Sequence, residues 1–289
     1  MHVQYPTLGY GKSWFPYFLP MLLKCTGFKV VQTWHEPPTR FRFFPNALPS
    51  DTLIGVEPEF LDRMRDRYAR LVCRKRTHFI PIGSNIPAVD LTADERNVIR
   101  EKYAGPARRL VVNFGFAYAS KGLELLFKIA DPERDTLVLM TALEPDRDDY
   151  HRKLVDEMEK SKWKGRVMIT GFLESRQVAE LLSAADAAVF PFRNGVGMRN
   201  GSFLASRNQG TFTITTSLER RGFIEAENVF YSRPDDVAAM KQALTEFIGR
   251  RRAPPTDLDN DWQSIALQHA SIYEDVSAKA AALSGKAHP

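Results

Sequence analysis

The stretch ADAAVFPFRNGVGMRNGSFLASRNQGTFTITT, Ala185 to Thr216, places a bare, polar segment between two runs that are rich in small, β-branched and aromatic residues. The two runs, 185–190 and 211–216, predict short strands buried in a sheet. Residues 202–209 predict a short helix that ends at Gly210, because glycine is favoured just past a helix end. A strand, a loop, a helix and a second strand in this order are typical of an α/β protein with a parallel sheet.

The same alternation continues on both sides of this stretch. It predicts further strands at 108–116, 136–142, 165–171 and 227–232, with helices at 121–130, 148–160, 175–185 and 234–250. Parallel strands need crossover connections, which are usually helices that cover both faces of the sheet. We therefore predict a complete Rossmann-like C-terminal domain over residues 87–260.

The first ninety residues show the same pattern with fewer elements. About three strands fit, at 28–34, 51–57 and 77–82, with helices at 13–25 and 59–73, and residues 83–90 are expected to be a linker. This predicts an incomplete Rossmann-like N-terminal domain over residues 1–86, which leaves a sheet edge open. The expected fold class is α/β with two domains.

The net charge of +5 is unevenly distributed. Residues 1–90 carry twelve Lys and Arg against seven acids, whereas the remainder is balanced. The excess gathers in the basic segment 59–76, which is either a solvated helix face or a surface that attracts anionic lipid. Without interleaved aromatic residues it does not favour nucleic acid. The two cysteines have no metal or redox spacing, which favours a cytoplasmic protein.

The polar segment has the residue types that a phosphate site needs. Gly195, Gly197 and Gly201 let the backbone approach a ligand closely, and Ser202 can cap the following helix or donate its hydroxyl. The N-terminus of that helix favours an anion, and Arg199 adds a cation that suits a diphosphate. A glycine-rich turn with an ordinary serine cap would have the same sequence.

A second loop supports the phosphate interpretation. The first strand of the C-terminal domain runs into NFGFAYASKG, 113–122, with Gly115 at its tip and Lys121 near the start of the next helix. Ligands of parallel sheets bind beyond the carboxyl ends of the strands. Lys121 is therefore expected on the same side of the sheet as Arg199. A lysine that simply faces solvent is the alternative.

At this point the sequence resembles a known family. The order SKGLELL, TGFLESRQVAELLSAADAAVFPF, GSFLA, QG and ENV is similar to the donor-binding domain of the GT-B glycosyltransferases, in particular the retaining family 4. The resemblance implies a donor site for a nucleotide-diphosphate sugar formed by Gly115, Phe116, Lys121, Gly122, Gly171, Phe172, Leu173, Asn194, Gly195, Val196, Gly197, Arg199, Gly201 and Ser202. VVQTWHE, 30–36, is similar to the acceptor domain of the family, which implies that His35 lies near the donor sugar.

The resemblance also sets expectations about activity. It implies transfer of a sugar to a glycan or lipid-linked acceptor hydroxyl, with retention, and with His35, Lys121 and Arg199 as catalytic residues. No metal ion and no cofactor besides the donor substrate are expected. Helix 261–284 should pack back on the first domain, and the protein should be cytoplasmic, with peripheral contact to the inner membrane face through residues 59–76.

The sequence also departs from the family. Two glutamates that many members carry eight residues apart are Gly197 and Ala205 here, and the family's opening strand and glycine-rich turn are not found, so the chain is expected to begin inside the acceptor domain. A catalytically inactive subunit that binds a nucleotide sugar therefore remains an alternative. A nucleotide-sugar epimerase is less favoured, because no pair of carboxylates can be placed for acid and base.

Overall fold

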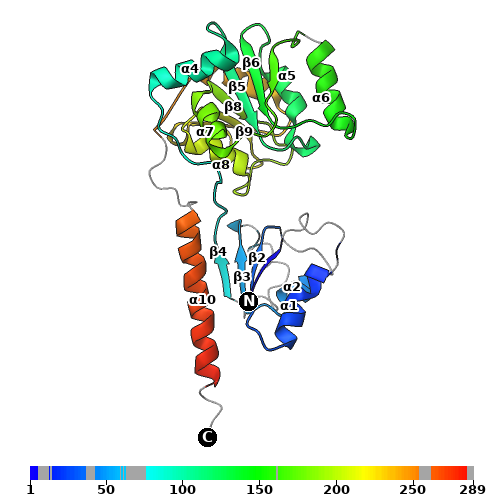
Figure 1. Cartoon of the computed structure of the whole chain (residues 1–289), viewed down its shortest axis with the longest axis vertical. Coiled ribbons are helices and arrows are strands. Elements are labelled where there is room, and N and C mark those ends of the chain that lie inside the picture. Colours follow the sequence, from blue (N-terminus) through cyan, green and yellow to red (C-terminus); the bar gives the residue numbers. More distant parts are fainter. Residues whose placement is uncertain are drawn as a thin grey trace. The chain divides into compact units, whose positions relative to one another are not determined.

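The computed structural model describes residues 1–5, 13, 15–36, 43–58, 60, 62, 76–160, 162–253 and 262–284. The chain divides into two compact units. The N-terminal unit comprises residues 1–83 and 259–289, and the C-terminal unit comprises residues 84–258. Each unit has its own sheet with helices on both faces (Figure 1). The α/β fold class expected from the sequence is confirmed.

The sheet of the C-terminal unit has, in the described residues, the strand order β10-β11-β9-β8-β5-β6-β7. All neighbouring strands are parallel except β10 and β11. The chain first builds the sheet outward from β5 to β7, then returns to the other side of β5 with β8, so the strand order reverses between β5 and β8. The strands are β5 Arg109–Phe114, β6 Asp135–Met140, β7 Val167–Ile169, β8 Ala187–Phe190, β9 Thr213–Thr216, β10 Gly222–Ile224 and β11 Val229–Ser232.

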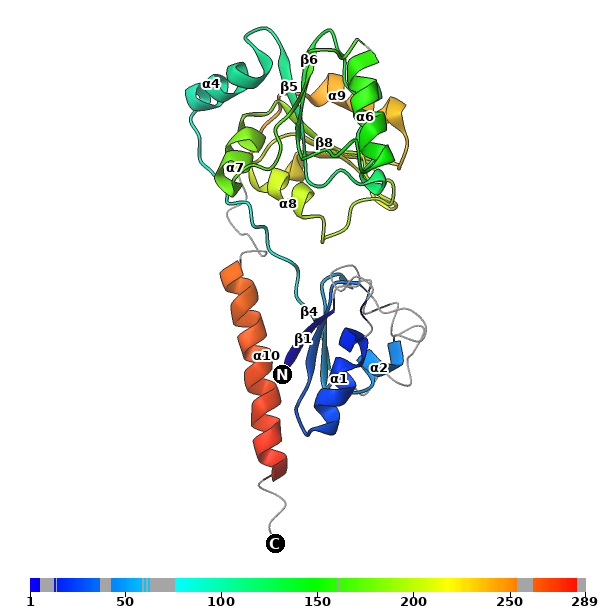
Figure 2. The same cartoon turned by 45° about the vertical axis from the view of Figure 1, so that its right-hand side comes forward.

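Helices cover both faces of this sheet. In Figure 2, α4, α7 and α8 lie on one side, and α6 and α9 lie on the other. A continuous apolar cluster joins strand residues such as Val111 and Ile214 to helix residues such as Leu126 and Met240. The helices are α4 Ala93–Ala104, α5 Leu126–Ile129, α6 Asp149–Lys160, α7 Ser175–Ala184, α8 Gly201–Asn208 and α9 Val237–Phe247, with short 3₁₀ turns at Ala119–Lys121, Leu123–Leu125 and Glu225–Glu227.

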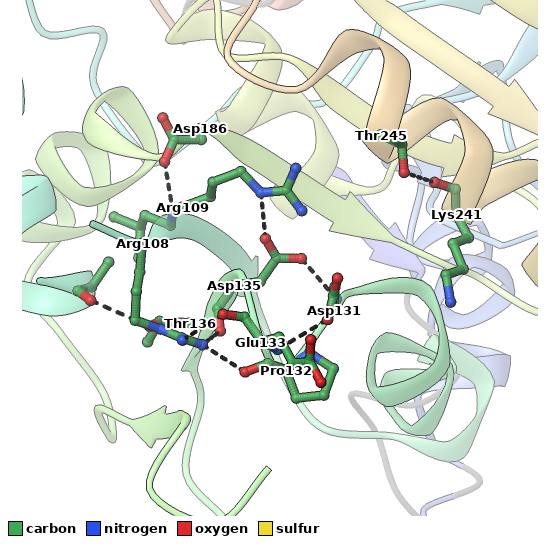
Figure 3. A network of polar contacts seen from close by, with 12 residues as sticks. Arg108, Arg109, Asp131, Pro132, Glu133, Asp135, Thr136, Asp186, Lys241 and Thr245 are labelled. Carbon is green, nitrogen blue, oxygen red and sulfur yellow. Dashed lines mark hydrogen bonds and ion pairs between the residues drawn. The ribbon is translucent and has the colours of Figure 1, made fainter. Parts of the chain in front are cut away.

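The amino ends of β5 and β6 are held by a polar network (Figure 3). Asp135, whose side chain is fully buried, accepts hydrogen bonds from Arg109 Nε at 2.6 Å and from the Asp131 amide at 2.8 Å. Arg108 binds carbonyl groups of the turn that leads into β6, and Asp186 accepts from the Leu110 amide at 2.6 Å. The carboxylates and guanidinium groups of this end are thus used in contacts within the fold.

The sheet of the N-terminal unit has the order β1-β2-β3-β4 in the described residues and is parallel throughout. Helices α1 and α2 cover one face, where Tyr5, Tyr17 and Trp34 pack together, and α10 covers the other through Ile265 and Ile272 (Figure 2). The elements are β1 His2–Tyr5, α1 Phe15–Cys25, β2 Val31–Trp34, α2 Phe43–Ala47, β3 Thr52–Gly55, β4 Arg76–Phe79 and α10 Trp262–Ser284.

Several details differ from the sequence prediction. Strand β1 adds a fourth strand to the N-terminal sheet, where about three were expected, and β10 and α4 were not predicted. The predicted helix at 121–130 begins as two 3₁₀ turns, because Gly122 has a positive φ of 66° that interrupts a regular helix. Most of the basic segment 59–76 lies outside the described residues. No helix in the described part of the chain has the length and apolarity needed to span a bilayer.

Candidate functional site

Two of the predicted loops meet at the carboxyl edge of the C-terminal sheet. β5 ends at Phe114 and continues into Gly115, and β8 ends at Phe190 and continues into the glycine-rich segment. These are the strands between which the order reverses, the position where open α/β sheets usually bind ligands. A Cβ atom on Gly115, which has a φ of 124°, would lie 3.6 Å from Cβ and 3.7 Å from Oγ of Ser202. The predicted pairing of the strand tip with the start of the later helix is therefore present.

The two loops also touch through their backbones. The Arg193 amide donates to the carbonyl oxygen of Ser120 at 3.0 Å. Next to it, a Cβ atom on Gly122 would lie only 2.4 Å from the carbonyl oxygen of Pro191. Gly122 is in the left-handed region, so glycine is needed here both for its conformation and for the close approach. These two contacts fix the backbone on either side of Lys121.

Lys121 is a half-buried cation without an anionic partner in the described part of the chain. Its Nζ lies 4.5 Å from the centroid of the buried Phe192 ring, and it forms no ion pair with any carboxylate of the described residues. Burial lowers the pKa of its ammonium group, and the positive charge of Arg199 lowers the pKa further. Two cations that repel each other at a sheet edge provide a favourable place for an anion.

The start of α8 differs in detail from the sequence prediction. The helix begins at Gly201 and its N-cap residue is Asn200, so of the two roles expected for Ser202, capping the helix or donating its hydroxyl, the structure does not show the first. Asn200 Oδ1 instead accepts from the Gly197 amide at 2.7 Å, which folds the loop into a tight turn before the helix. Ser202 lies in the first helical turn, where its side chain faces Gly115.

The rest of the glycine-rich segment is anchored to β9. The Val196 amide donates to the Thr216 carbonyl oxygen at 2.7 Å, and Gly195, with a φ of 76°, lies against the backbone of Leu218. Asn194 and Arg199 are exposed on this segment. The segment is thus held by the sheet at its base, while Asn194 and Arg199 are accessible to solvent.

A second group of predicted residues forms an aromatic cluster at the same edge. The ring centroids of Phe116 and Phe172 are 6.1 Å apart, and Tyr118, which the sequence analysis did not select, stacks on Phe116 at 5.8 Å. These side chains are 60%, 74% and 60% exposed in the order Phe116, Phe172 and Tyr118. Gly171 and Leu173 flank Phe172 in the loop that follows β7. Exposed, clustered aromatic rings are a suitable surface for stacking a planar or ring-shaped group.

His35 belongs to the N-terminal unit. It directly follows β2, its amide donates to the Tyr5 carbonyl oxygen at 3.2 Å, and its Nε2 lies 2.8 Å from Gln4 Oε1. Within its own unit, His35 is therefore at the carboxyl end of a parallel strand, as expected. Tyr5 and Gln4 belong to β1, the strand that the sequence analysis missed.

The sequence analysis also missed residues that shape the anion site. Phe192 contacts the Lys121 ammonium, Asn200 folds the loop before α8 by accepting from the Gly197 amide, and Arg193 with Glu124 joins the two loops. Phe192 and Arg193 directly follow a buried strand in the sequence, which is a signal that could have identified them. Glu124 had no such signal, because its role depends on the 3₁₀ turns that bring it back toward β8.

Comparisons with known proteins give a fold but no sequence family. No protein-family model and no curated protein matches the chain. Among solved structures, a sucrose-phosphate synthase from Thermosynechococcus elongatus is similar, with a TM-score of 0.69 and 20% identity, covering 96% of this chain and 73% of that one. The Anabaena protein Alr3699/HepE, solved in complex with UDP and glucose, has a TM-score of 0.63 and 14% identity, covering 93% and 76%.

A third similar structure is WaaG, a glycosyltransferase involved in lipopolysaccharide biosynthesis. Its TM-score is 0.61 at 14% identity, and the match covers 92% of this chain and 80% of WaaG. Identities this low establish the architecture alone. The chain therefore has the GT-B fold of these glycosyltransferases, as the sequence predicted.

Proposed function

We propose that the protein is a glycosyltransferase that moves a sugar from a nucleotide-diphosphate sugar to an acceptor hydroxyl of a glycan or lipid-linked glycan. The observation that carries this proposal is the half-buried Lys121, which lies where two loops touch, is close enough to Arg199 to be affected by its charge, and has no carboxylate partner among the described residues. The GT-B fold supports it, and so does the similar Anabaena protein, which was solved in complex with UDP-glucose. The diphosphate would bind between Gly115, Lys121, Arg199 and the N-terminus of α8.

The chemistry follows from the charge that develops on the leaving group. The bond between the anomeric carbon and the diphosphate oxygen breaks, a bond to the acceptor oxygen forms, and the acceptor proton is released. Lys121, Arg199 and the α8 N-terminus would stabilise the nucleoside diphosphate as it departs, which is an electrostatic role that needs no metal ion. We further propose that the reaction retains the anomeric configuration, that His35 contacts the sugar, and that the nucleobase stacks near Phe116 and Phe172.

The test is a substitution of Lys121. We expect Lys121→Ala to reduce turnover on the order of 100-fold, because removing one preorganised charged donor from a transition state typically has this effect. The measurement is release of the nucleoside diphosphate from a panel of nucleotide sugars, with circular dichroism to check the fold. Lys128→Ala is the matched control, because Lys128 is an exposed lysine on α5, close to Lys121 in the sequence.

The outcomes separate two functions. Turnover that is unchanged in Lys121→Ala would remove this residue from the site. Donor binding by calorimetry without any transfer or hydrolysis would support the alternative of an inactive nucleotide-sugar-binding subunit. The absence of carboxylates at Gly197 and Ala205 is the observation that favours this alternative.

A further inference from the structure

A chain of charged and hydrogen-bonding side chains joins four elements beside the anion site. Arg193, in the segment after β8, binds Glu124 through Nη2 and binds Asp235 Oδ1 through Nη1 at 2.6 Å. Glu124 also accepts from the hydroxyl of Tyr150 in α6, and that hydroxyl accepts from the Leu123 amide at 2.9 Å. We call Arg193, Glu124, Tyr150 and Asp235 the loop clamp.

The clamp lies directly next to Lys121 along both loops. The Arg193 amide binds the Ser120 carbonyl oxygen, one residue before Lys121, and Gly122 packs on the Pro191 carbonyl, one residue after it. Lys121 therefore lies opposite Phe192, between two fixed backbone contacts. The ion pair between Arg193 and Glu124 adds a side-chain contact between the β8 loop and the turn that follows Gly122.

Within the clamp, the single cation Arg193 is shared by two carboxylates, Glu124 and Asp235. The hydrogen bond to Glu124 raises the pKa of Arg193, and Asp235 acts in the same direction. Burial alone would raise the pKa of the Glu124 carboxyl, but the hydrogen bonds from Tyr150 and Arg193 outweigh burial and lower it. Arg193 is thus committed to two carboxylates, in contrast to Lys121, which has none among the described residues.

Asp235 provides a further sign that the clamp is built into the fold. It is one of two non-glycine residues in the described chain with a positive φ, at 61°. Aspartate accepts the left-handed conformation at a modest cost in free energy, and such a conformation persists when surrounding contacts determine it. The contact with Arg193 is one of them, and it presents the carboxylate of Asp235 to the β8 loop.

We propose that Arg193 and Glu124 are positioning residues, which hold the Lys121 loop against the β8 loop so that the anion site exists before an anion arrives. This inference rests on the proposed function of the site as a diphosphate site. When a binding-competent geometry is only partly populated, the apparent affinity falls by the fraction that is competent. Loss of the clamp should therefore weaken anion binding although neither residue touches the anion.

The experiment measures binding of inorganic pyrophosphate to the full chain by calorimetry, together with titration of the Lys121 side chain by NMR of ¹³C-labelled lysine. We expect Arg193→Ala and Glu124→Gln to weaken pyrophosphate binding about tenfold, as expected when the competent geometry falls to about a tenth of the population. We also expect the pKa of Lys121 to rise in both variants, because the released ammonium becomes more exposed. A purely structural role elsewhere would leave this pKa unchanged.

Two comparisons make the result specific. Arg176→Ala is the matched control, because Arg176 and Glu180 form an ion pair at 2.9 Å on α7 that has the same chemistry but is not part of the clamp. In a Lys121→Ala background, Arg193→Ala should cause no further loss of affinity, because the clamp acts through Lys121 and coupled residues are not additive. Asp235→Asn changes the more exposed of the two carboxylates of the clamp. It can replace Arg193→Ala in the binding experiment if Arg193→Ala does not fold.

Each outcome decides a different question. If Arg193→Ala and Glu124→Gln bind pyrophosphate as tightly as the wild type, and the pKa of Lys121 is unchanged, the positioning role of the clamp is wrong. The anion site itself would not be affected by this result. A wild type that does not bind pyrophosphate would overturn the proposed function, and the clamp with it. Weaker binding in the clamp variants but not in Arg176→Ala supports the inference.

Discussion

Gly122 is the residue whose replacement should damage the site most directly. Its φ of 66° disfavours any side chain, and a Cβ atom would lie 2.4 Å from the carbonyl oxygen of Pro191. Gly165 is the matched control, because its φ is 70° but nothing lies within 4 Å of the added Cβ position. We expect Gly165→Ala to cost about 1 kcal/mol of unfolding free energy for the left-handed conformation alone. We expect Gly122→Ala to reduce the free energy of unfolding by roughly 1–3 kcal/mol more than Gly165→Ala does, because its Cβ atom also collides with the Pro191 carbonyl oxygen.

Urea unfolding measures these free energies, and calorimetry with pyrophosphate measures the site in the same variants. Gly122→Ala should also weaken pyrophosphate binding, because relief of the collision separates the two loops. Equal destabilisation by the two substitutions would show that the Gly122 loop moves away from Pro191 without cost.

At the level of residues, the sequence predicted the parts of the site that follow from strand ends and glycines. Gly115 and Ser202 do lie together, and Lys121 lies near Arg199, because both loops leave the same edge of a parallel sheet. The position of Phe192 after a buried strand could have marked it as a residue of this edge, but the sequence could not show that it contacts Lys121. That contact depends on how closely the two loops approach each other.

Helix α10 forms a hydrogen bond with His2, so we expect its docking to respond to pH. His2 Nδ1 lies 2.6 Å from the Tyr273 hydroxyl of α10, and Nε2 lies 2.8 Å from Thr33 Oγ1. Burial, together with the charges of His269, the amino terminus and His35, lowers the pKa of His2 to about 4. In the unfolded chain the pKa of a histidine is about 6.5. Between about pH 6.5 and about pH 4, His2 therefore binds a proton more tightly in the unfolded chain than in the folded one.

The stabilisation from neutral His2 is thus fully present above about pH 6.5 and is lost as the pH falls toward about 4. We expect the free energy of opening of α10, from hydrogen exchange corrected for intrinsic rates, to fall between pH 7.5 and pH 5. His2→Gln keeps a hydrogen-bonding side chain but does not titrate, so its α10 should depend less on pH. An identical pH dependence in both proteins would assign the effect to other groups.

At the level of elements, segments with clear apolar runs were predicted, whereas the strands β1 and β10 and the twelve-residue, largely polar helix α4 were missed. Strands such as β5 and β6 have six residues each and are buried, so their apolar runs stand out. Strand β1 has four residues, His2 to Tyr5, and β10 has three, and neither shows the apolar run that marks an equally short strand such as β8, Ala187–Phe190. Their pairing is decided by neighbours: β1 aligns with β2, and β10 folds back on β11.

At the level of the whole molecule, the two edges of the C-terminal sheet differ in how their charged side chains are paired. At the amino ends, Asp135 and Arg109 form an ion pair at 2.6 Å within the fold (Figure 3). At the carboxyl ends, Lys121 is left without a carboxylate among the described residues. This difference between the two edges supports the proposed anion site at the carboxyl edge, and the sequence alone could not show it.

The C-terminal unit should carry the anion site by itself, because the residues proposed to hold the diphosphate all lie within residues 84–258. Both ends of this unit are tied to the end of α8. Gln209 accepts from the Val89 amide at 3.0 Å and donates to the Pro87 carbonyl oxygen at 2.8 Å, and the Arg252 amide donates to Gly210 at 3.0 Å. We therefore expect a polypeptide of residues 84–258 to fold cooperatively and to bind pyrophosphate as tightly as the full chain.

Calorimetry on the two polypeptides compares their affinities directly, and Lys121→Ala in each provides the control for binding at other basic residues. Transfer to an acceptor should be lost in the shorter polypeptide, because His35 belongs to the N-terminal unit. A folded C-terminal unit that binds pyrophosphate much more weakly than the full chain would mean that residues outside 84–258 contribute to the anion site. Equal affinities would show that the reversal of strand order at β5 and β8 is sufficient to build it.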